Sequence, residues 1–191
     1  MRFARTRSTR LAATICLTVT APAFASDGLE ALAQPGRVLM LRHANAPGYG
    51  DPPGFRIGDC RTQRNLDERG RAQARATGER LRALGIREAR VYSSQWCRAL
   101  ETGRLLGLGE VRELPALNSF FQGHAEREPT LATLRDFLAR QTADGSPLIL
   151  VTHQVVINAF AEEVPASGGG SIFELDGTGG LRWITATRPV R

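Results

Sequence analysis

The chain has 191 residues, of which 42% are hydrophobic, and this fits one domain with a packed core rather than a disordered chain. Its formal charge of +6 gathers at the start, because residues 1–25 carry four arginines and no acidic residue. The remainder holds 21 basic and 19 acidic residues, so no basic surface is left to follow a nucleic-acid backbone, and no nucleic acid is expected as a partner. The chain contains no lysine, which excludes Schiff-base and P-loop chemistry.

The first 25 residues have the pattern of a secretory signal peptide. An arginine-bearing start precedes the apolar run 11–19, and Ala-Phe-Ala at 23–25 is the small-x-small pattern that signal peptidase accepts. We therefore expect residues 1–25 to be cleaved, residues 26–191 to form a single domain, and the protein to be periplasmic or secreted. A retained anchor is the alternative, although the run is shorter than a stable membrane span. No stable span is expected after cleavage.

Strand and helix patterns alternate from residue 37 onward. A short apolar run at 37–42 predicts a buried strand, and the proline- and glycine-rich stretch 44–69 predicts a long loop. Amphipathic or capped stretches then predict helices, and apolar runs predict further strands. In chain order these are a helix at 70–84, a strand at 89–92, a helix at 95–106 with Ser93 and Ser94 as candidate caps, a strand at 111–114, a loop at 118–128, a helix at 129–141, a strand at 148–152 and a helix at 154–160.

The last part of the chain differs from this alternation. Residues 172–175 and 181–187 flank Asp176-Gly177, as the strands of an antiparallel pair would. The whole pattern predicts an α/β fold, a three-layer αβα sandwich with a mostly parallel central sheet and C-terminal antiparallel strands.

Two cysteines, Cys60 and Cys97, remain after the expected cleavage, because Cys16 lies in the signal. An even number of cysteines in an oxidising compartment favours a disulfide between them. Closing a loop of this length stabilises a fold by roughly 3–4 kcal/mol in the chain-entropy description. The alternative is two unpaired thiols that behave as small apolar residues.

Charged and titratable residues stand where the parallel strands end. Arg42 and His43 close the first strand, His153 follows the strand at 148–152, and Arg98 lies in the first turn of the helix after the second strand. Ligands of parallel sheets bind beyond the carboxyl ends of the strands, so we expect these side chains to converge. Guanidinium groups and a helix N-terminus favour a phosphate group. A zinc site at the two histidines is the competing interpretation, but neighbouring arginines repel a cation, and neither a metal nor another cofactor is expected.

Three segments carry a resemblance to a known family. Arg42-His43-Ala44 resembles the Arg-His-Gly signature of the histidine phosphatase superfamily, branch 1, with alanine in place of glycine. Ser93 to Thr102, with Arg98 and a Glu-Thr pair, resembles the second segment of the family, and Val151-Thr152-His153 resembles the third. The order and spacing agree over about residues 37–160. The resemblance implies a histidine phosphatase-like fold and a phosphatase that needs no metal.

The resemblance also implies a role for each residue. His43 would attack phosphorus and become phosphohistidine, while Arg42, Arg98 and His153 would hold the phosphoryl oxygens. Ser94 and Asn118 are further candidates for substrate binding.

One position departs from the family pattern. Many members carry a glutamate directly after an asparagine as the proton donor, whereas here Ser119 follows Asn118. Three explanations stay open. A carboxylate from a loop could serve instead, with Asp51, Glu126 and Glu128 as candidates; the leaving group could need no acid; or the enzyme could be slow.

The sequence therefore favours an exported phosphomonoesterase acting on a small-molecule or glycan phosphate ester, such as a cell-envelope or sugar phosphate. Two alternatives remain: a phosphohistidine phosphatase, and a catalytically degenerate domain that binds phosphate without turnover.

Overall fold

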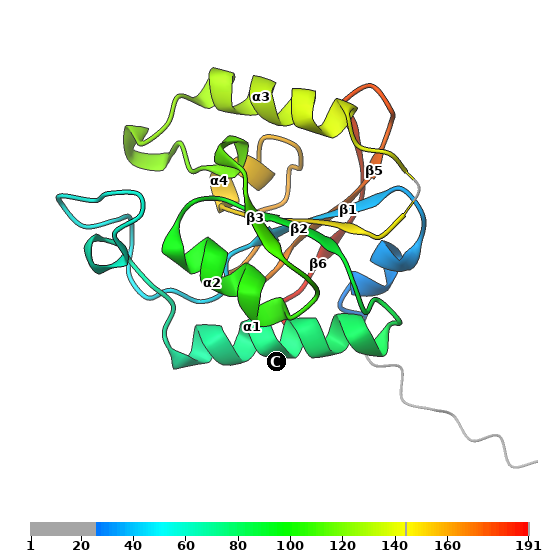
Figure 1. Cartoon of the computed structure of the whole chain (residues 1–191), viewed down its shortest axis with the longest axis horizontal. Helices are drawn as coiled ribbons and strands as arrows, with labels where there is room; N and C mark the ends of the chain where they lie inside the picture. Colours follow the sequence, from blue (N-terminus) through cyan, green and yellow to red (C-terminus); the bar gives the residue numbers. More distant parts are fainter. Residues whose placement is uncertain (1–25, 144, 191) are drawn as a thin grey trace, which may run out of the picture.

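The fold is known from a computed structural model that describes residues 26–143 and 145–190, so the expected signal peptide lies outside the described residues. A six-stranded mixed sheet forms its centre, with the strand order β3-β2-β4-β1-β5-β6 (Figure 1). The strands are β1 (Arg37–Arg42), β2 (Arg90–Ser93), β3 (Val111–Glu113), β4 (Leu148–Thr152), β5 (Gly170–Leu175) and β6 (Leu181–Thr187). The α-helices are α1 (Glu68–Ala83), α2 (Cys97–Leu106), α3 (Arg127–Ala139) and α4 (Gln154–Ile157). Short 3-10 turns are η1 (Leu29–Ala33), η2 (Cys60–Thr62), η3 (Pro115–Leu117) and η4 (Phe121–Gly123).

The sheet is parallel at its centre and antiparallel at its C-terminal edge, as predicted. Strand β4 pairs in parallel with β1 and β2, and β2 pairs in parallel with β3. Strand β5 runs antiparallel to both β1 and β6. All five residues of β4 are buried, because helices cover both faces of the central strands.

Side chains of β1 alternate between two separate cores. Leu39 and Leu41 pack in the core under α1 and α2, whereas Val38 and Met40 pack in the core under α3 and α4. In Figure 1, α3 lies above the sheet and α1 and α2 lie below it. This confirms the predicted three-layer sandwich.

Helix boundaries differ from the predicted ones by a few residues. Helix α1 begins at Glu68 because Asp67 caps it, accepting a hydrogen bond from the backbone N–H of Gly70 at 2.7 Å. Helix α2 begins at Cys97 rather than 95, with Trp96 as the N-cap residue, so the prediction that Ser93 or Ser94 caps it was wrong.

Two other helices also shift. Helix α3 starts at Arg127, two residues early, with Pro129 in its first turn. Helix α4 ends at Ile157 instead of 160, because the next residues form tight turns in which Ala159 and Phe160 bond three residues back. None of the helices in residues 26–143 and 145–190 is both long and apolar enough to cross a bilayer.

Candidate active site

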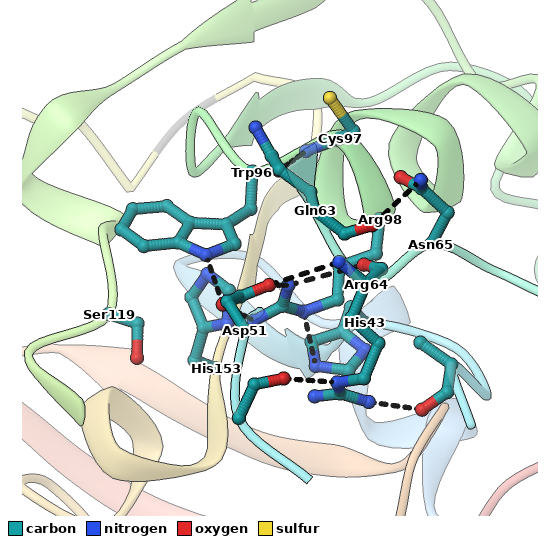
Figure 2. Close-up of polar contacts among 12 residues, drawn as sticks. His43, Asp51, Gln63, Arg64, Asn65, Trp96, Cys97, Arg98, Ser119 and His153 are labelled. Carbon is teal, nitrogen blue, oxygen red and sulfur yellow. Dashed lines mark hydrogen bonds and ion pairs between the residues drawn. The ribbon is translucent and has the colours of Figure 1, made fainter. Parts of the chain in front are cut away.

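The carboxyl ends of β1 and β4 and the start of α2 meet at one edge of the sheet (Figure 2). The rings of His43 and His153 lie with their centroids 5.4 Å apart, and Arg98 Nε lies 3.2 Å from His43 Nε2. All three residues are buried, with exposed fractions of 3%, 4% and 3% for His43, His153 and Arg98. The structure thus brings together residues that lie far apart along the chain.

The two ring nitrogens of His43 have different roles: one is a hydrogen-bond donor and the other carries a lone pair. Its Nδ1 donates to the carbonyl oxygen of Ala44 at 2.8 Å, so Nε2 carries the lone pair and accepts from Arg98. Burial, followed by the positive charge of Arg98, lowers the pKa of His43 from 6.5 to about 3. The imidazole is therefore neutral at neutral pH, which is the form that can attack phosphorus.

His153 is held by Ser94. Its Nε2 lies 2.7 Å from Ser94 Oγ, and that hydroxyl also accepts a hydrogen bond from the backbone N–H of Trp96. Burial, then the neighbouring His43 and Arg98, lowers the pKa of His153 well below its ordinary value. Ser94 is not among the residues that line the cavity at this site, and its hydroxyl contacts His153.

Arg98 forms a two-point ion pair with Asp51. Arg98 donates to the two carboxylate oxygens at 2.7 and 3.0 Å, and both side chains are almost fully buried. Figure 2 shows Asp51 between this guanidinium and the indole of Trp96, whose Nε1 donates to Asp51 at 2.9 Å. Burial by itself would raise the pKa of Asp51, but the hydrogen bonds from Arg98 and Trp96 outweigh it and hold the pKa below its ordinary value.

A cavity of about 170 Å³ opens above His43. Its wall consists of Arg42, His43, Gly48, Tyr49, Gly50, Asp51, Arg64, Arg98, Ser119, Phe121, His153, Gln154 and Val155. Three guanidinium groups face this space, and the buried Nε of Arg42 has no hydrogen-bond partner among the described residues. Such a cavity favours an anion with several oxygen atoms.

Among the charged residues of the wall, Arg64 is the one that the sequence did not predict. It comes from the loop between β1 and α1, where its Nε donates to the carbonyl oxygen of Gly50 at 2.8 Å and its NH1 donates to that of Ala46. In the sequence it is marked only by its place three residues before Asp67, the N-cap residue of α1. That place does not predict where its side chain points.

Several predicted site residues lie outside the cavity wall. Glu126 and Glu128 are exposed, because α3 begins at Arg127 and presents its first turn to solvent, where Glu128 pairs with Arg127. Asn118 instead bonds Gln95 twice, accepting from its backbone N–H at 2.9 Å and donating to its side-chain oxygen at 3.0 Å. Of the three candidate proton donors, the structure places only Asp51 in the wall.

The predicted disulfide is confirmed. Cys60 and Cys97 are joined, with their Cα atoms 5.7 Å apart. The bond ties the loop that carries Asp51 and Arg64 to the first residue of α2, directly before Arg98. Among the described residues, no three His, Cys, Asp or Glu side chains gather as metal ligands.

The fold and the site define an α/β protein with an anion cavity built around a neutral histidine. The family model of the histidine phosphatase superfamily (branch 1) matches residues 38–140. The chain belongs to this superfamily.

Relatives of known sequence and structure agree with this membership. Over 69 residues the chain is 38% identical to the mitochondrial serine/threonine-protein phosphatase Pgam5 of Drosophila virilis, which covers 36% of this chain and 21% of the relative. The chain thus matches about a fifth of the length of its curated relatives.

Two solved structures share the fold at low sequence identity. The protein histidine phosphatase SixA, complexed with tungstate, has a TM-score of 0.58 at 19% identity, covering 80% of this chain and 97% of its own. A mycobacterial glucosyl-3-phosphoglycerate phosphatase has a TM-score of 0.57 at 19% identity, covering 83% of this chain and 100% of its own.

Proposed function

We propose that the protein is an exported phosphatase that needs no metal and acts through a phosphohistidine on His43. The observation that carries this proposal is the neutral Nε2 of His43, fixed by the Nδ1 bond to Ala44 and facing a cavity lined by three arginines. Membership of the histidine phosphatase superfamily supports the same chemistry.

The proposed reaction has two transfers. The lone pair of His43 Nε2 attacks phosphorus, the bond from phosphorus to the leaving atom breaks, and its electron pair departs with the leaving group. Water then attacks the phosphohistidine, the N–P bond breaks, its electron pair returns to Nε2, and the water proton leaves with phosphate or to solvent. Arg42, Arg64 and Arg98 hold the phosphoryl oxygens in both steps and offset their charge in the transition states.

The first test replaces the nucleophile. His43→Ala should lower turnover of p-nitrophenyl phosphate in EDTA by on the order of 10³-fold or more. Wild-type protein quenched under alkaline denaturing conditions should carry labelled phosphate on His43, and the variant should carry none. His124→Ala is the matched control, because that histidine is exposed and lies outside the cavity wall, and it should keep full activity. Substantial turnover by His43→Ala would refute the assignment.

Export is part of the proposal and has its own support. Residues 1–25 have the composition of a signal peptide, and the Cys60–Cys97 disulfide suits an oxidising compartment. After expression of the full chain in a bacterial host, we expect the protein in the periplasm or medium, starting at Ser26 and free of reactive thiols. A full-length cytoplasmic protein with three free thiols would contradict export.

The substrates that we propose are phosphate groups on envelope or other exported molecules, sugar phosphates among them. A phosphohistidine phosphatase is the second candidate, and Ser119 favours it, because a P–N bond can break without the carboxylic acid that the family often places after the asparagine. The fold is shared with relatives whose names mention each class, protein histidine phosphatase and glucosyl-3-phosphoglycerate phosphatase.

A further inference from the structure

Among the residues that the structure describes, Asp51 is the one carboxylate in the cavity wall, and both of its oxygens already accept hydrogen bonds. Asp51 accepts two hydrogen bonds from Arg98, one from Trp96 Nε1 and one from the backbone N–H of Arg64 at 3.2 Å. Every one of these partners is a donor. A protonated Asp51 would turn its own O–H against a donor group, so the contacts hold Asp51 as the anion. An anion cannot give a proton to a leaving group.

The other titratable groups in the wall are poor substitutes. His43 is the proposed nucleophile, and its one proton is bound to the Ala44 carbonyl oxygen. His153 is buried near Arg98, and both the burial and the positive charge of Arg98 disfavour its protonated form. Tyr49 stands at the rim with an exposed fraction of 89%, packed edge-on against Phe121, whereas His43 lies buried at the base.

From this inventory we infer, on the basis of the proposed function, that the enzyme acts on phosphoryl groups whose leaving atom departs without a proton from the protein. Asp51 is then a positioning residue for Arg98 and not the general acid. In the first transfer the electron pair of the broken bond stays on the leaving group, which departs as an anion or, when solvent has already protonated it, as a neutral ring, and no proton moves from the chain.

This narrows the substrate class. Phosphoanhydrides, acyl phosphates and aryl phosphates with an electron-withdrawing group, such as p-nitrophenyl phosphate, release weakly basic anions. Phosphohistidine releases a neutral ring once solvent has protonated its remote nitrogen. Phosphate esters of simple alcohols and sugar hydroxyls release strongly basic alkoxides, and these should be slow. Of the envelope and sugar phosphates in the proposed function, the inference therefore favours a diphosphate end group and makes a phosphate ester of a sugar hydroxyl a slow substrate.

The test measures how kcat/KM depends on the leaving group. Wild-type protein in EDTA is assayed with p-nitrophenyl phosphate, phenyl phosphate, glycerol phosphate, inorganic pyrophosphate and phosphoimidazole. A general acid contributes about 10²–10⁴-fold for basic leaving groups, so its absence should make phenyl phosphate slower than p-nitrophenyl phosphate by on the order of 10²-fold or more. Glycerol phosphate should be slower still. Values that agree within about threefold across the three esters would overturn the inference.

Two variants test whether Asp51 or Tyr49 acts as the general acid. Asp51→Asn should lower all three ester rates by one common factor, because Arg98 loses its partner whatever the leaving group. Tyr49→Phe should leave the ratio of p-nitrophenyl to phenyl phosphate unchanged. A variant that slows phenyl phosphate selectively would identify that residue as the acid and overturn the inference. The pyrophosphate and phosphoimidazole rates tell anhydride from P–N substrates.

The proposed function and this inference fail in different ways. If wild-type protein does not hydrolyse p-nitrophenyl phosphate, or if His43→Ala still does, the phosphohistidine proposal fails. If both of those tests succeed and the leaving-group dependence is flat, only the inference fails.

Discussion

Arg64 holds its own loop in shape and also faces the anion cavity. Its contacts with Gly50 and Ala46 fix the guanidinium at the wall, and burial, then the positive charge of Arg98, lowers its pKa below the ordinary value of an arginine. The group stays cationic, because even a lowered arginine pKa lies far above neutral. Because the positive charges of Arg64 and Arg98 repel each other, a phosphate anion bound between them stabilises both.

Replacing this residue should weaken phosphate binding. Arg64→Gln should raise KM for p-nitrophenyl phosphate about 10- to 100-fold, since a charge-assisted hydrogen bond contributes about 1.5–3 kcal/mol. Inorganic phosphate should inhibit the variant more weakly by a similar factor. Arg69→Gln is the matched control, because Arg69 is exposed on α1 and lies outside the wall. An unchanged KM in Arg64→Gln would show that the guanidinium only supports its loop.

Which site residues could be predicted follows from where they sit. His43 and His153 directly follow buried strands, and parallel strands bring their carboxyl ends together whatever the loops do. Arg64 and Asp51 come from a long loop whose path depends on its own hydrogen bonds and on the Cys60–Cys97 disulfide. Periodicity carries no information about such a path, so Asp51 was only one of three candidates and Arg64 was missed.

At the scale of elements, strands were easier to predict than helix ends. Apolar runs bounded by glycine, proline or charge predicted β1, β4 and β6 with the bounds that the structure has. Helix starts depend on which side chain reaches a free backbone N–H. Asp67 does so for α1, whereas α2 begins after Trp96, whose side chain makes no cap bond.

Gly78 in helix α1 has a role in packing that helix propensity does not predict. Gly78 weakens an isolated helix, but a Cβ atom there would lie 2.0 Å from the carbonyl oxygen of Leu106 at the end of α2. The glycine therefore permits the close approach of α1 and α2. This approach fixes α2, and with it Arg98, against the sheet edge.

At the scale of the whole molecule, the buried site makes folding sensitive to acid. The pKa of His43 is lowered from 6.5 to about 3, and the pKa of His153 is lowered in the same direction. Below pH 6.5 the unfolded chain therefore binds protons that the folded chain excludes. The free energy of unfolding is highest above this range and falls as the pH drops through it.

The expected slope is large enough to measure. Well below the unfolded pKa, each excluded proton costs about 1.4 kcal/mol per pH unit, and two buried histidines double this figure. His43→Gln should remove one of the two contributions, so its stability should fall about half as steeply between pH 6 and pH 4.5. Asp51, whose pKa is held below 3.8, changes charge only in more acidic solution and does not affect this interval.

Urea unfolding of the disulfide-bonded protein at several pH values provides the measurement, with the fluorescence of the buried Trp96 as a probe. At pH 8 the histidines are neutral in the folded and in the unfolded chain. The difference in the free energy of unfolding between wild type and His43→Gln at this pH therefore gives the effect of the substitution itself. Parallel curves for wild type and His43→Gln would mean that His43 takes up its proton without unfolding. In mild acid His43 would then be protonated in the folded protein and could not attack phosphorus, so burial would not be what keeps the imidazole neutral.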